Sequence, residues 1–381
     1  MKNYDVVVIG AGAFGAWTAN FLARLKTKVL LLDAYGAGNS RASSGGESRI
    51  IRMGYGKDEI YTRWAMRSLD LWREFAARSG RPLFQNTGVL WMAGSNDHYT
   101  AQTLETLQKL KVPNQRLSAA ELSKKYAQIN FDGVAWGLLE PGSGVLLARQ
   151  AVQVLVAEAR QHGVEYRVAA ITAPRGKGKA QSVKTADGSE VSAAKFVFAC
   201  GPWLPKVFPE LLADRIFPSR QEVFFFGVPA GSETFVPPLM PAWINLSDEA
   251  YGVPDLESRG FKVAFDAHGT HFDPDTGVRV VTPESIQKIR QYVARRFPTL
   301  RDAPIVETRV CQYENTSNGD FLIDRHPDFE NVWLVGGGSG HGFKHGPALG
   351  EYVAGLVTGG TATEPRFSLA SKGMLQKRAV Y

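Results

Sequence analysis

The residues from Asp5 to Gly15, DVVVIGAGAFG, decide the fold of this chain. A short β-branched run leads directly into a Gly-x-Gly-x-x-Gly turn, and residues 16–25 are mostly apolar helix formers. A second apolar run, residues 28–32, ends on Asp33. The βαβ unit that binds dinucleotides typically consists of a strand, this turn, a helix, a second strand and an acid. The stretch therefore predicts a binding site for an adenine dinucleotide.

The glycines and the acid of this unit have separate expected roles. Gly10 makes the tight turn, Gly12 lets the backbone approach a pyrophosphate, and Gly15 lets the helix pack closely on the strand. The helix N-terminus directs N–H groups at the phosphates, and Asp33 is placed to accept a hydrogen bond from a ribose hydroxyl. The predicted contacts of this region are Gly10, Gly12, Ala13, Phe14, Gly15, Asp33 and Ser44.

Composition bounds the class of protein. With 381 residues, 44% of them apolar and 21% charged, the chain is typical of a soluble globular protein of about two domains. It lacks a long apolar run or a signal peptide, so we expect no membrane span and a cytoplasmic location. The net charge of +7 is dispersed, which suits small anions better than nucleic acid. Cys200 and Cys311 supply neither a disulfide framework nor a CxxC metal pair.

A second glycine-rich turn, GGGSGHG over residues 336–342, follows an apolar strand near the C-terminus. Pro347 favours the start of a helix just beyond it, whose N-terminus would face an anion or, in an FAD protein, the electron-rich edge of the reduced flavin. His341 stands where Gly-x-Ser-x-Gly requires glycine, which disfavours a serine hydrolase. Because a second Gly-x-Gly-x-x-Gly for NAD(P)H is lacking, FAD is favoured as the resident cofactor.

The remaining patterns predict an α/β (α+β) fold with two interleaved domains. Helices are expected over 57–78 and 147–162, from a capping box at Ser118, and after Thr282 and Pro347. Strands are expected over 164–172, 182–185, 195–199 and 332–335, and residues 218–280 alternate as in an antiparallel sheet. The prediction is a Rossmann-like FAD-binding domain of residues 1–85, 147–217 and 320–381. Residues 86–146 and 218–319 would form a mixed or antiparallel-sheet substrate domain.

Three further segments resemble one known family. They are SRIIR at residues 48–52, CQY at 311–313 with DFLID at 320–324, and SGHGFK at 339–344. In combination they resemble the monomeric sarcosine oxidases, whose relatives include N-methyltryptophan, pipecolate and fructosyl-amine oxidases. The resemblance runs from the first strand to about residue 360. It implies an FAD domain joined to a mixed-sheet substrate domain, with chemistry at the flavin face between them.

The resemblance also implies roles for single residues. Arg52 and Lys344 match the pair that binds the substrate carboxylate, and Cys311 matches the cysteine that carries FAD through a covalent thioether. Lys262 matches a lysine that activates dioxygen, where a cation stabilises developing negative charge. Arg49 would lie near the flavin and stabilise its reduced anion. The implied pocket walls are Tyr251, Tyr313 and His341, and the further cofactor contacts are Gly338, Gly340, Gly342, Phe343 and Lys344.

Asp266 departs from the family pattern. It lies four residues after Lys262, where sarcosine oxidases have histidine, whereas fructosyl-amine oxidases resemble this chain in having an acid near that position. An acid facing the pocket would suit a polyhydroxylated or cationic amine substituent, although strand alternation could equally point Asp266 at solvent. The departure puts sarcosine itself in doubt as the substrate.

Together these residues predict an FAD-dependent oxidase that converts the secondary amine of an amino acid to an imine and reduces dioxygen to hydrogen peroxide. Three alternatives stay open: a fructosyl-amino-acid oxidase, a dehydrogenase of the same fold with another electron acceptor, and a non-catalytic scaffold. We expect a small-molecule substrate, no nucleic-acid or membrane partner, and a monomer. The segment 268–275, with two histidines and two aspartates, is interpreted as a turn rather than a metal site.

Overall fold

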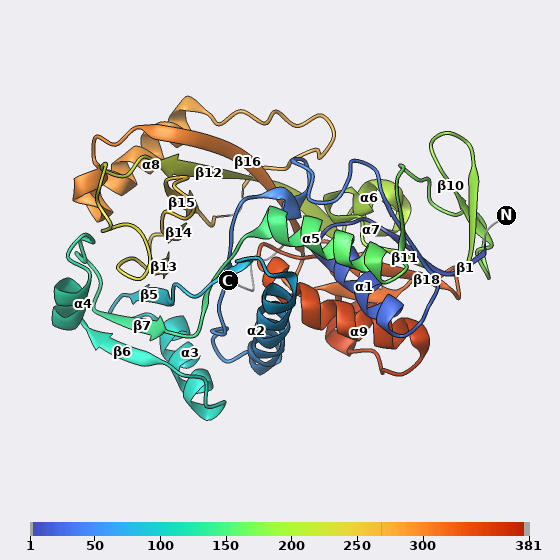
Figure 1. The fold of residues 1–381 in the computed structure, drawn as a ribbon, viewed down its shortest axis with the longest axis horizontal. Coiled ribbons are helices and arrows are strands. Elements are labelled where there is room, and N and C mark those ends of the chain that lie inside the picture. Colours follow the sequence, from blue (N-terminus) through green and yellow to red (C-terminus); the bar gives the residue numbers. More distant parts are fainter. Residues whose placement is uncertain (1–2, 268, 377–381) are drawn as a thin grey trace.

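The computed structural model describes residues 3–267 and 269–376 and contains a seven-stranded sheet that carries the dinucleotide unit (Figure 1). Its strands are β1 (Asn3–Ile9), β2 (Val29–Asp33), β9 (Glu165–Val168), β10 (Ser182–Lys184), β11 (Glu190–Phe198), β17 (Leu322–Arg325) and β18 (Val332–Gly336). The order is β17-β18-β11-β1-β2-β9, with β10 paired to β11. The strands from β18 to β9 are parallel, and β10 and β17 run antiparallel. This is a Rossmann-like arrangement.

A second sheet of eight strands is mostly antiparallel. Its members are β5 (Val89–Ala93), β6 (Gln115–Ser118), β7 (Trp136–Glu140), β12 (Ile216–Phe226), β13 (Ala242–Asn245), β14 (Ala250–Val253), β15 (Phe261–Phe265) and β16 (Ile305–Thr316). The order is β16-β12-β15-β14-β13-β5-β7-β6, and only the β13–β5 pair is parallel. A small third sheet joins β3 (Arg49–Ile51), β8 (Gly144–Leu146) and β4 (Phe84–Gln85). The predicted fold class is confirmed.

The helices divide between the two large sheets. They are α1 (Ala13–Arg24), α2 (Glu59–Ser79), α3 (His98–Lys109), α4 (Ala119–Lys125), α5 (Ala148–Gln161), α6 (Leu204–Val207), α7 (Pro209–Leu212), α8 (Pro283–Arg296) and α9 (Gly346–Thr358). Apolar side chains of α1, α5 and α9 pack on one face of the seven-stranded sheet, and those of α6 and α7 pack on the other. The eight-stranded sheet packs against α4 and α8. Within the described residues, no helix is both long and apolar enough to cross a membrane.

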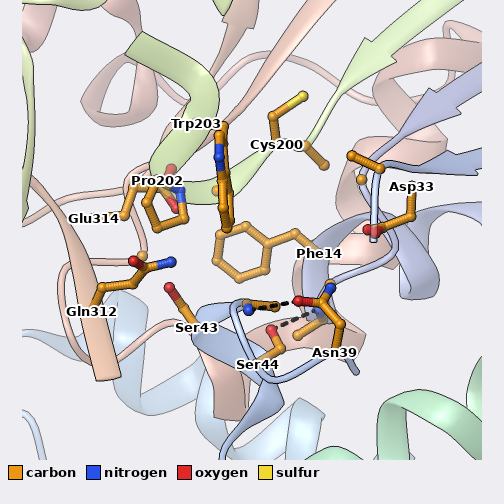
Figure 2. A pocket seen from close by; sticks show the side chains of 18 of the residues that line it. Phe14, Asp33, Asn39, Ser43, Ser44, Cys200, Pro202, Trp203, Gln312 and Glu314 are labelled. Carbon is orange, nitrogen blue, oxygen red and sulfur yellow. Dashed lines mark hydrogen bonds between the residues drawn. The ribbon is translucent and has the colours of Figure 1, made fainter. Parts of the chain in front are cut away.

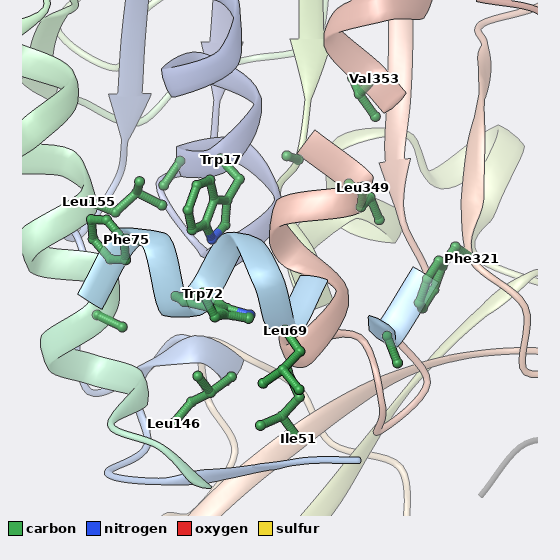
Figure 3. Close-up of a cluster of buried hydrophobic side chains, with 14 of the residues drawn as sticks. Trp17, Ile51, Leu69, Trp72, Phe75, Leu146, Leu155, Phe321, Leu349 and Val353 are labelled. Atoms are coloured by element: carbon green, nitrogen blue, oxygen red, sulfur yellow. The ribbon is translucent and has the colours of Figure 1, made fainter. Parts of the chain in front are cut away.

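The largest core cluster fixes the position of the dinucleotide turn (Figure 3). Trp17 of α1 is fully buried, and its ring meets those of Trp72 and Phe75 of α2 edge-on, with centroids 5.1 and 5.3 Å away. Helix α9 lies directly against α1, because a Cβ on Gly350 would come within 2.6 Å of the Trp17 backbone. The cluster therefore holds α1, α2 and α9 as one unit behind the turn.

The structure departs from the predicted elements in a few places. The expected helices over 57–78 and 147–162 correspond to α2 and α5, and the predicted capping box at Ser118 is present with Glu121. The strand expected over 164–172 is shorter, since β9 ends at Val168. Helix α3 and strand β16 were not predicted, because their sequences are rich in polar residues. For β16 the polarity has a physical cause, since its side chains form cavity walls.

The predicted division into two domains follows the sheets closely. All strands of the seven-stranded sheet fall in residues 1–85, 147–217 and 320–381, and those of the eight-stranded sheet fall in the other segments except for the first two residues of β12. The third sheet joins the two sets, because β8 pairs with β3 and β4. We keep the division as a proposal that this arrangement supports.

Candidate active site

The Gly-x-Gly-x-x-Gly turn lines a cavity of about 270 Å³ at the ends of β1, β2 and β11 (Figure 2). Gly10 has a φ of +104°, and a Cβ there would lie 2.2 Å from the carbonyl oxygen of Ala199. A Cβ on Gly15 would lie 1.9 Å from the carbonyl oxygen of Gly10, so Gly15 serves packing and is absent from the cavity wall. Both glycines are required by the turn that brings the start of α1 to the cavity.

The polar groups beside the start of α1 are ordered by the protein itself. The Ser44 hydroxyl accepts from the Ala13 N–H at 3.0 Å. The Asp33 carboxylate accepts from the N–H groups of Ala11, Tyr35 and Gly36 at 2.7, 2.9 and 2.8 Å. Burial raises the pKa of Asp33 against the effect of these three donors. Asp33 thus stands at the end of β2 with a fixed orientation toward the cavity.

The cavity fits a dinucleotide cofactor. The buried hydroxyl of Ser43 has no hydrogen-bond partner in the described part of the chain, which indicates a missing polar ligand. Phe14, Gly338, Gly340 and Gly342 also line the cavity. Open glycines, a helix N-terminus and an unpaired hydroxyl are the features that the pyrophosphate of FAD would use.

A second cavity, of about 110 Å³, adjoins the first. The residues that line both are Arg49, Tyr313, Gly340 and Phe343. The predicted residues that line only the second are Arg52, Tyr251, Asp266, Cys311, His341 and Lys344. The structure therefore brings together predicted residues from β3, β14, β16 and the turn before α9. Lys344, which was predicted to contact both cofactor and substrate, lines only the second cavity.

Strand β16 separates the two cavities, and its alternation assigns its side chains. Gln312 and Glu314 line the first cavity, whereas Cys311 and Asn315 line the second. Successive side chains of a strand point to opposite faces, so this pattern follows directly from the strand. Tyr313 reaches both cavities.

Arg52 is held between two aromatic rings. Its Cζ atom lies 4.5 Å from the ring centroid of Tyr55 and 4.7 Å from that of Trp91, and its guanidinium donates to the Gly54 carbonyl. The buried Glu140 carboxylate accepts from Trp91 Nε1 at 2.8 Å and from the Gly54 N–H at 3.2 Å. Arg52 is 5% exposed. The guanidinium of Arg52 is therefore held in one orientation at the wall of the second cavity.

Lys344 and His341 join a buried network centred on Tyr55. Lys344 Nζ donates to Tyr55 Oη at 2.9 Å and to the His341 carbonyl at 3.1 Å. His341 Nε2 lies 3.0 Å from the Gly319 carbonyl, which makes it the donor and leaves Nδ1 to accept from the Tyr55 hydroxyl at 3.2 Å. His345 Nε2 lies within hydrogen-bond distance of Tyr55 Oη, at 2.7 Å. Burial and the Lys344 charge hold the pKa of both histidines well below their usual range, so both are neutral.

Arg52 and Lys344 are the two cations that line only the second cavity. Arg52 and Lys344 form no ion pair with the described acidic residues. Burial and the nearby Arg52 charge hold the pKa of Lys344 well below its usual range. An incoming carboxylate would relieve this repulsion, which makes the pair a receptor for an anion.

Arg49 lies at the junction of the cavities, close to Cys311 of the second cavity and to the buried Lys262. The Arg49 guanidinium donates to the Ser43 carbonyl at 2.6 Å and to Cys311 Sγ at 3.3 Å. Lys262 is 2% exposed, and its Nζ donates to the Ser48 carbonyl at 3.0 Å and its hydroxyl at 3.3 Å. Burial and the Arg49 charge lower the pKa of Lys262 to about 7. Lys262 lines neither cavity, so its action on dioxygen stays a prediction.

Asp266 faces the second cavity, which resolves the orientation that strand alternation left open. Its carboxylate accepts from Tyr313 Oη at 2.9 Å. The Lys262 ammonium lies 5.7 Å from the ring centroid of Tyr251, another residue of this cavity wall. The Asp266 carboxylate and the Tyr313 hydroxyl make this end of the second cavity polar.

The two aspartates of the segment 268–275 form ion pairs with a lysine. Asp273 and Asp275 both accept from Lys206 Nζ, at 2.8 and 2.5 Å. No group of three or more His, Cys, Asp or Glu side chains that could hold a metal ion occurs within residues 3–267 and 269–376. His268, considered with this segment, lies outside the described residues.

Sequence reasoning missed several residues of the site. Tyr55 and Trp91 belong to no motif, and Glu140 ends an apolar strand, so only the folded structure reveals them. Gln312 and Glu314 flank Tyr313, and the two-residue period of a strand would have indicated them. Cys200, interpreted as structural, also lines the first cavity.

Comparison with known proteins identifies the class. A family model described as FAD dependent oxidoreductase (DAO) matches residues 5–356. Monomeric sarcosine oxidase from Bacillus sp. (strain NS-129) is 30% identical over 390 residues and 99% of each chain, and N-methyl-L-tryptophan oxidase from Salmonella agona (strain SL483) is 28% identical over 379 residues, 96% of this chain and 97% of the relative. L-proline dehydrogenase from P. horikoshii has the same fold, with a TM-score of 0.85, 21% identity and 97% of each chain covered.

The chain belongs to the family of FAD-dependent oxidoreductases. The predicted resemblance to the monomeric sarcosine oxidases is confirmed, and so is the prediction of an FAD-dependent amine oxidoreductase. The two adjoining cavities are compatible with this class, which needs room for a cofactor and a substrate side by side.

Proposed function

We propose that this chain oxidises the secondary amine of an N-substituted amino acid to an imine with FAD. The observation that carries the proposal is the pair of buried cations, Arg52 and Lys344, in a cavity that adjoins the proposed cofactor cavity and shares lining residues with it. Sarcosine and N-methyl-L-tryptophan, named in the relatives, each have a carboxylate beside a secondary amine. The cations supply the charge that such a carboxylate needs.

The residues act mainly by orientation. Arg52 presents its remaining N–H donors in a plane fixed by two rings, and Lys344 adds a point charge held by Tyr55. With the carboxylate held there, the amine carbon is turned toward the wall shared by the cavities, at Arg49 and Tyr313. FAD, when bound, accepts the two electrons and the hydrogen removed from that carbon. The neutral His341 lines the second cavity without adding charge to it.

Dioxygen is the proposed electron acceptor and hydrogen peroxide the product. Lys262 supports this assignment, because a cation close to Arg49 stabilises negative charge that develops on oxygen. A dehydrogenase with another acceptor is the alternative, and reoxidation by air would distinguish the two. We also propose covalent attachment of FAD through Cys311, whose sulfur accepts from Arg49.

Asp266 favours a polar substituent on the amine. With Tyr313 donating to it, this carboxylate can accept from a hydroxyl or ammonium group of the substrate. A fructosyl amino acid, which has several hydroxyls, is therefore the second candidate substrate. Comparing Asp266→Asn with the wild type tests this choice: kcat/KM for a polyhydroxylated amine should fall while that for sarcosine stays unchanged or rises. Equal losses for both substrates would contradict it.

Dioxygen consumption tests the proposed reaction as a whole. Wild-type enzyme is assayed with an N-alkyl amino acid and with the same amine lacking the carboxylate, and the peroxide formed is measured. We expect turnover of the carboxylated amine only, with peroxide equal to the oxygen consumed. Equal turnover of both amines would contradict the carboxylate site.

A monomer and a cytoplasmic location belong to the same proposal, the latter supported by two unpaired cysteines.

A further inference from the structure

Glu314 places a carboxyl group in the wall of the cofactor cavity. It lies near the end of β16, is 7% exposed and is seen beside Gln312 and Pro202 in Figure 2. Its Oε1 accepts from the Gly337 N–H at 2.6 Å. Its Oε2 lies 3.6 Å from the position that a Cβ would take on Gly201, another residue of the cavity wall. One oxygen is therefore committed to the backbone, and the other lies at the cavity wall without a described partner.

No cation balances this carboxyl. Glu314 forms no ion pair with any described lysine or arginine. Among the described residues, the titratable group of a neighbouring element that interacts with it is Cys200 after β11, and burial raises the pKa of this thiol. Tyr313, next in the chain, directs its hydroxyl to Asp266 in the other cavity.

The uncharged form is the one that this environment favours. An ionised carboxylate that is buried without a cation loses its hydration and gains only one backbone N–H in return. Burial accordingly raises the pKa of Glu314 to about 8. Because Oε1 accepts from Gly337, the proton belongs on Oε2, the oxygen near Gly201.

We propose that Glu314 binds FAD as an uncharged carboxylic acid, with Oε2–H donating a hydrogen bond to an acceptor oxygen or nitrogen of FAD. FAD offers acceptors along its whole length, in the pyrophosphate, the ribityl chain and the flavin ring. An ionised carboxylate in the same place would repel the pyrophosphate and leave an acceptor of FAD unpaired. Glu314 is thus a cofactor-binding residue that works by being neutral, and it also fixes the Gly337 turn through Oε1.

The Glu314→Gln variant separates these two roles. Its amide oxygen can still accept from Gly337, and its NH₂ group can still donate to FAD, but the side chain no longer titrates. The parent is a Cys311→Ser holoenzyme, in which FAD is held without a thioether. Release of FAD is followed by the recovery of free FAD fluorescence over a pH range that brackets pH 8. Glu330→Gln, an exposed glutamate far from the cavity wall, is the matched control.

We expect the parent and Glu330→Gln to release FAD about tenfold faster at the alkaline end, the change that follows from losing one hydrogen bond near a new charge. Glu314→Gln should show no alkaline rise. A parent without the rise, or the same rise in Glu314→Gln, would overturn the proposal. No amine is needed, so the result is independent of the proposed amine oxidation.

A second measurement covers the case in which Glu314→Gln fails to retain FAD. Wild-type holoenzyme should show the infrared carbonyl band of a protonated carboxylic acid, which shifts when FAD is reduced with dithionite and disappears on titration above pH 8. Absence of such a band from the wild type would overturn the proposal. Its presence in wild type supports it.

Discussion

Replacing Arg52 by glutamine tests the carboxylate site most sharply. Arg52 is 5% exposed and lies between the rings of Tyr55 and Trp91, so its guanidinium is held in place for the carboxylate. A hydrogen bond to a charged group contributes about 1.5–3 kcal/mol. Since 1.4 kcal/mol is a factor of ten, Arg52→Gln should lower kcat/KM for a carboxylated amine roughly 10- to 150-fold.

The loss should appear chiefly in KM, because the carboxylate is bound alike before and during the reaction. Arg52→Lys keeps the charge but not the planar fork, and should fall between wild type and Arg52→Gln. Initial rates of oxygen consumption give both constants, and Arg301→Gln, at an exposed position, is the control for loss of a positive charge. An Arg52→Gln enzyme with wild-type KM for a carboxylated amine would refute the reasoning.

Three further predictions concern oxygen, attachment and stability. Lys262→Met should slow reoxidation of the reduced enzyme about 100-fold in stopped flow while leaving anaerobic reduction intact; unchanged reoxidation would show that Lys262 has no such role. Acid-precipitated wild type should stay yellow and Cys311→Ser should release its FAD, whereas yellow supernatant from both would exclude the thioether. Burial alone would raise the pKa of Glu158, but hydrogen bonds from Arg78 and Asn20 outweigh burial, so the pKa is lowered. The contribution of Glu158 to folding stability is present at pH values above its unfolded-state pKa and is lost as pH falls. Glu158→Gln should therefore lower the free energy of unfolding in urea by about 1 kcal/mol at pH 7. A difference between variant and wild type that persists in acid would contradict this.

The dinucleotide unit could be predicted because its signals are local. The turn at Gly10, the close packing at Gly15 and the acid at Asp33 are consequences of backbone geometry within one βαβ unit. Arg52 and Lys344 lie far apart in the chain, and only the family resemblance paired them. The structure supplies the physical link, since both contact Tyr55.

Other parts of the site depend on contacts that leave no pattern in the sequence. Asp266 follows the last residue of β15, where strand alternation no longer determines direction, and its hydrogen bond from Tyr313 decides the matter. The partners of Tyr55 come from the turn before α9, hundreds of residues later in the chain. Strand β16 escaped prediction because residues such as Gln312 and Glu314 face the first cavity rather than an apolar core.

The central claim is tested most directly by the flavin spectrum of the purified enzyme without oxygen. Sarcosine, L-pipecolate, an N-methyl aromatic amino acid and a fructosyl amino acid are added in turn. The account predicts a yellow protein whose absorption is bleached by at least one of these carboxylated secondary amines, and by none of the same amines without the carboxylate. A yellow protein that no member of the set bleaches would contradict the assignment of Arg52, Lys344 and Asp266 to an amino-acid substrate.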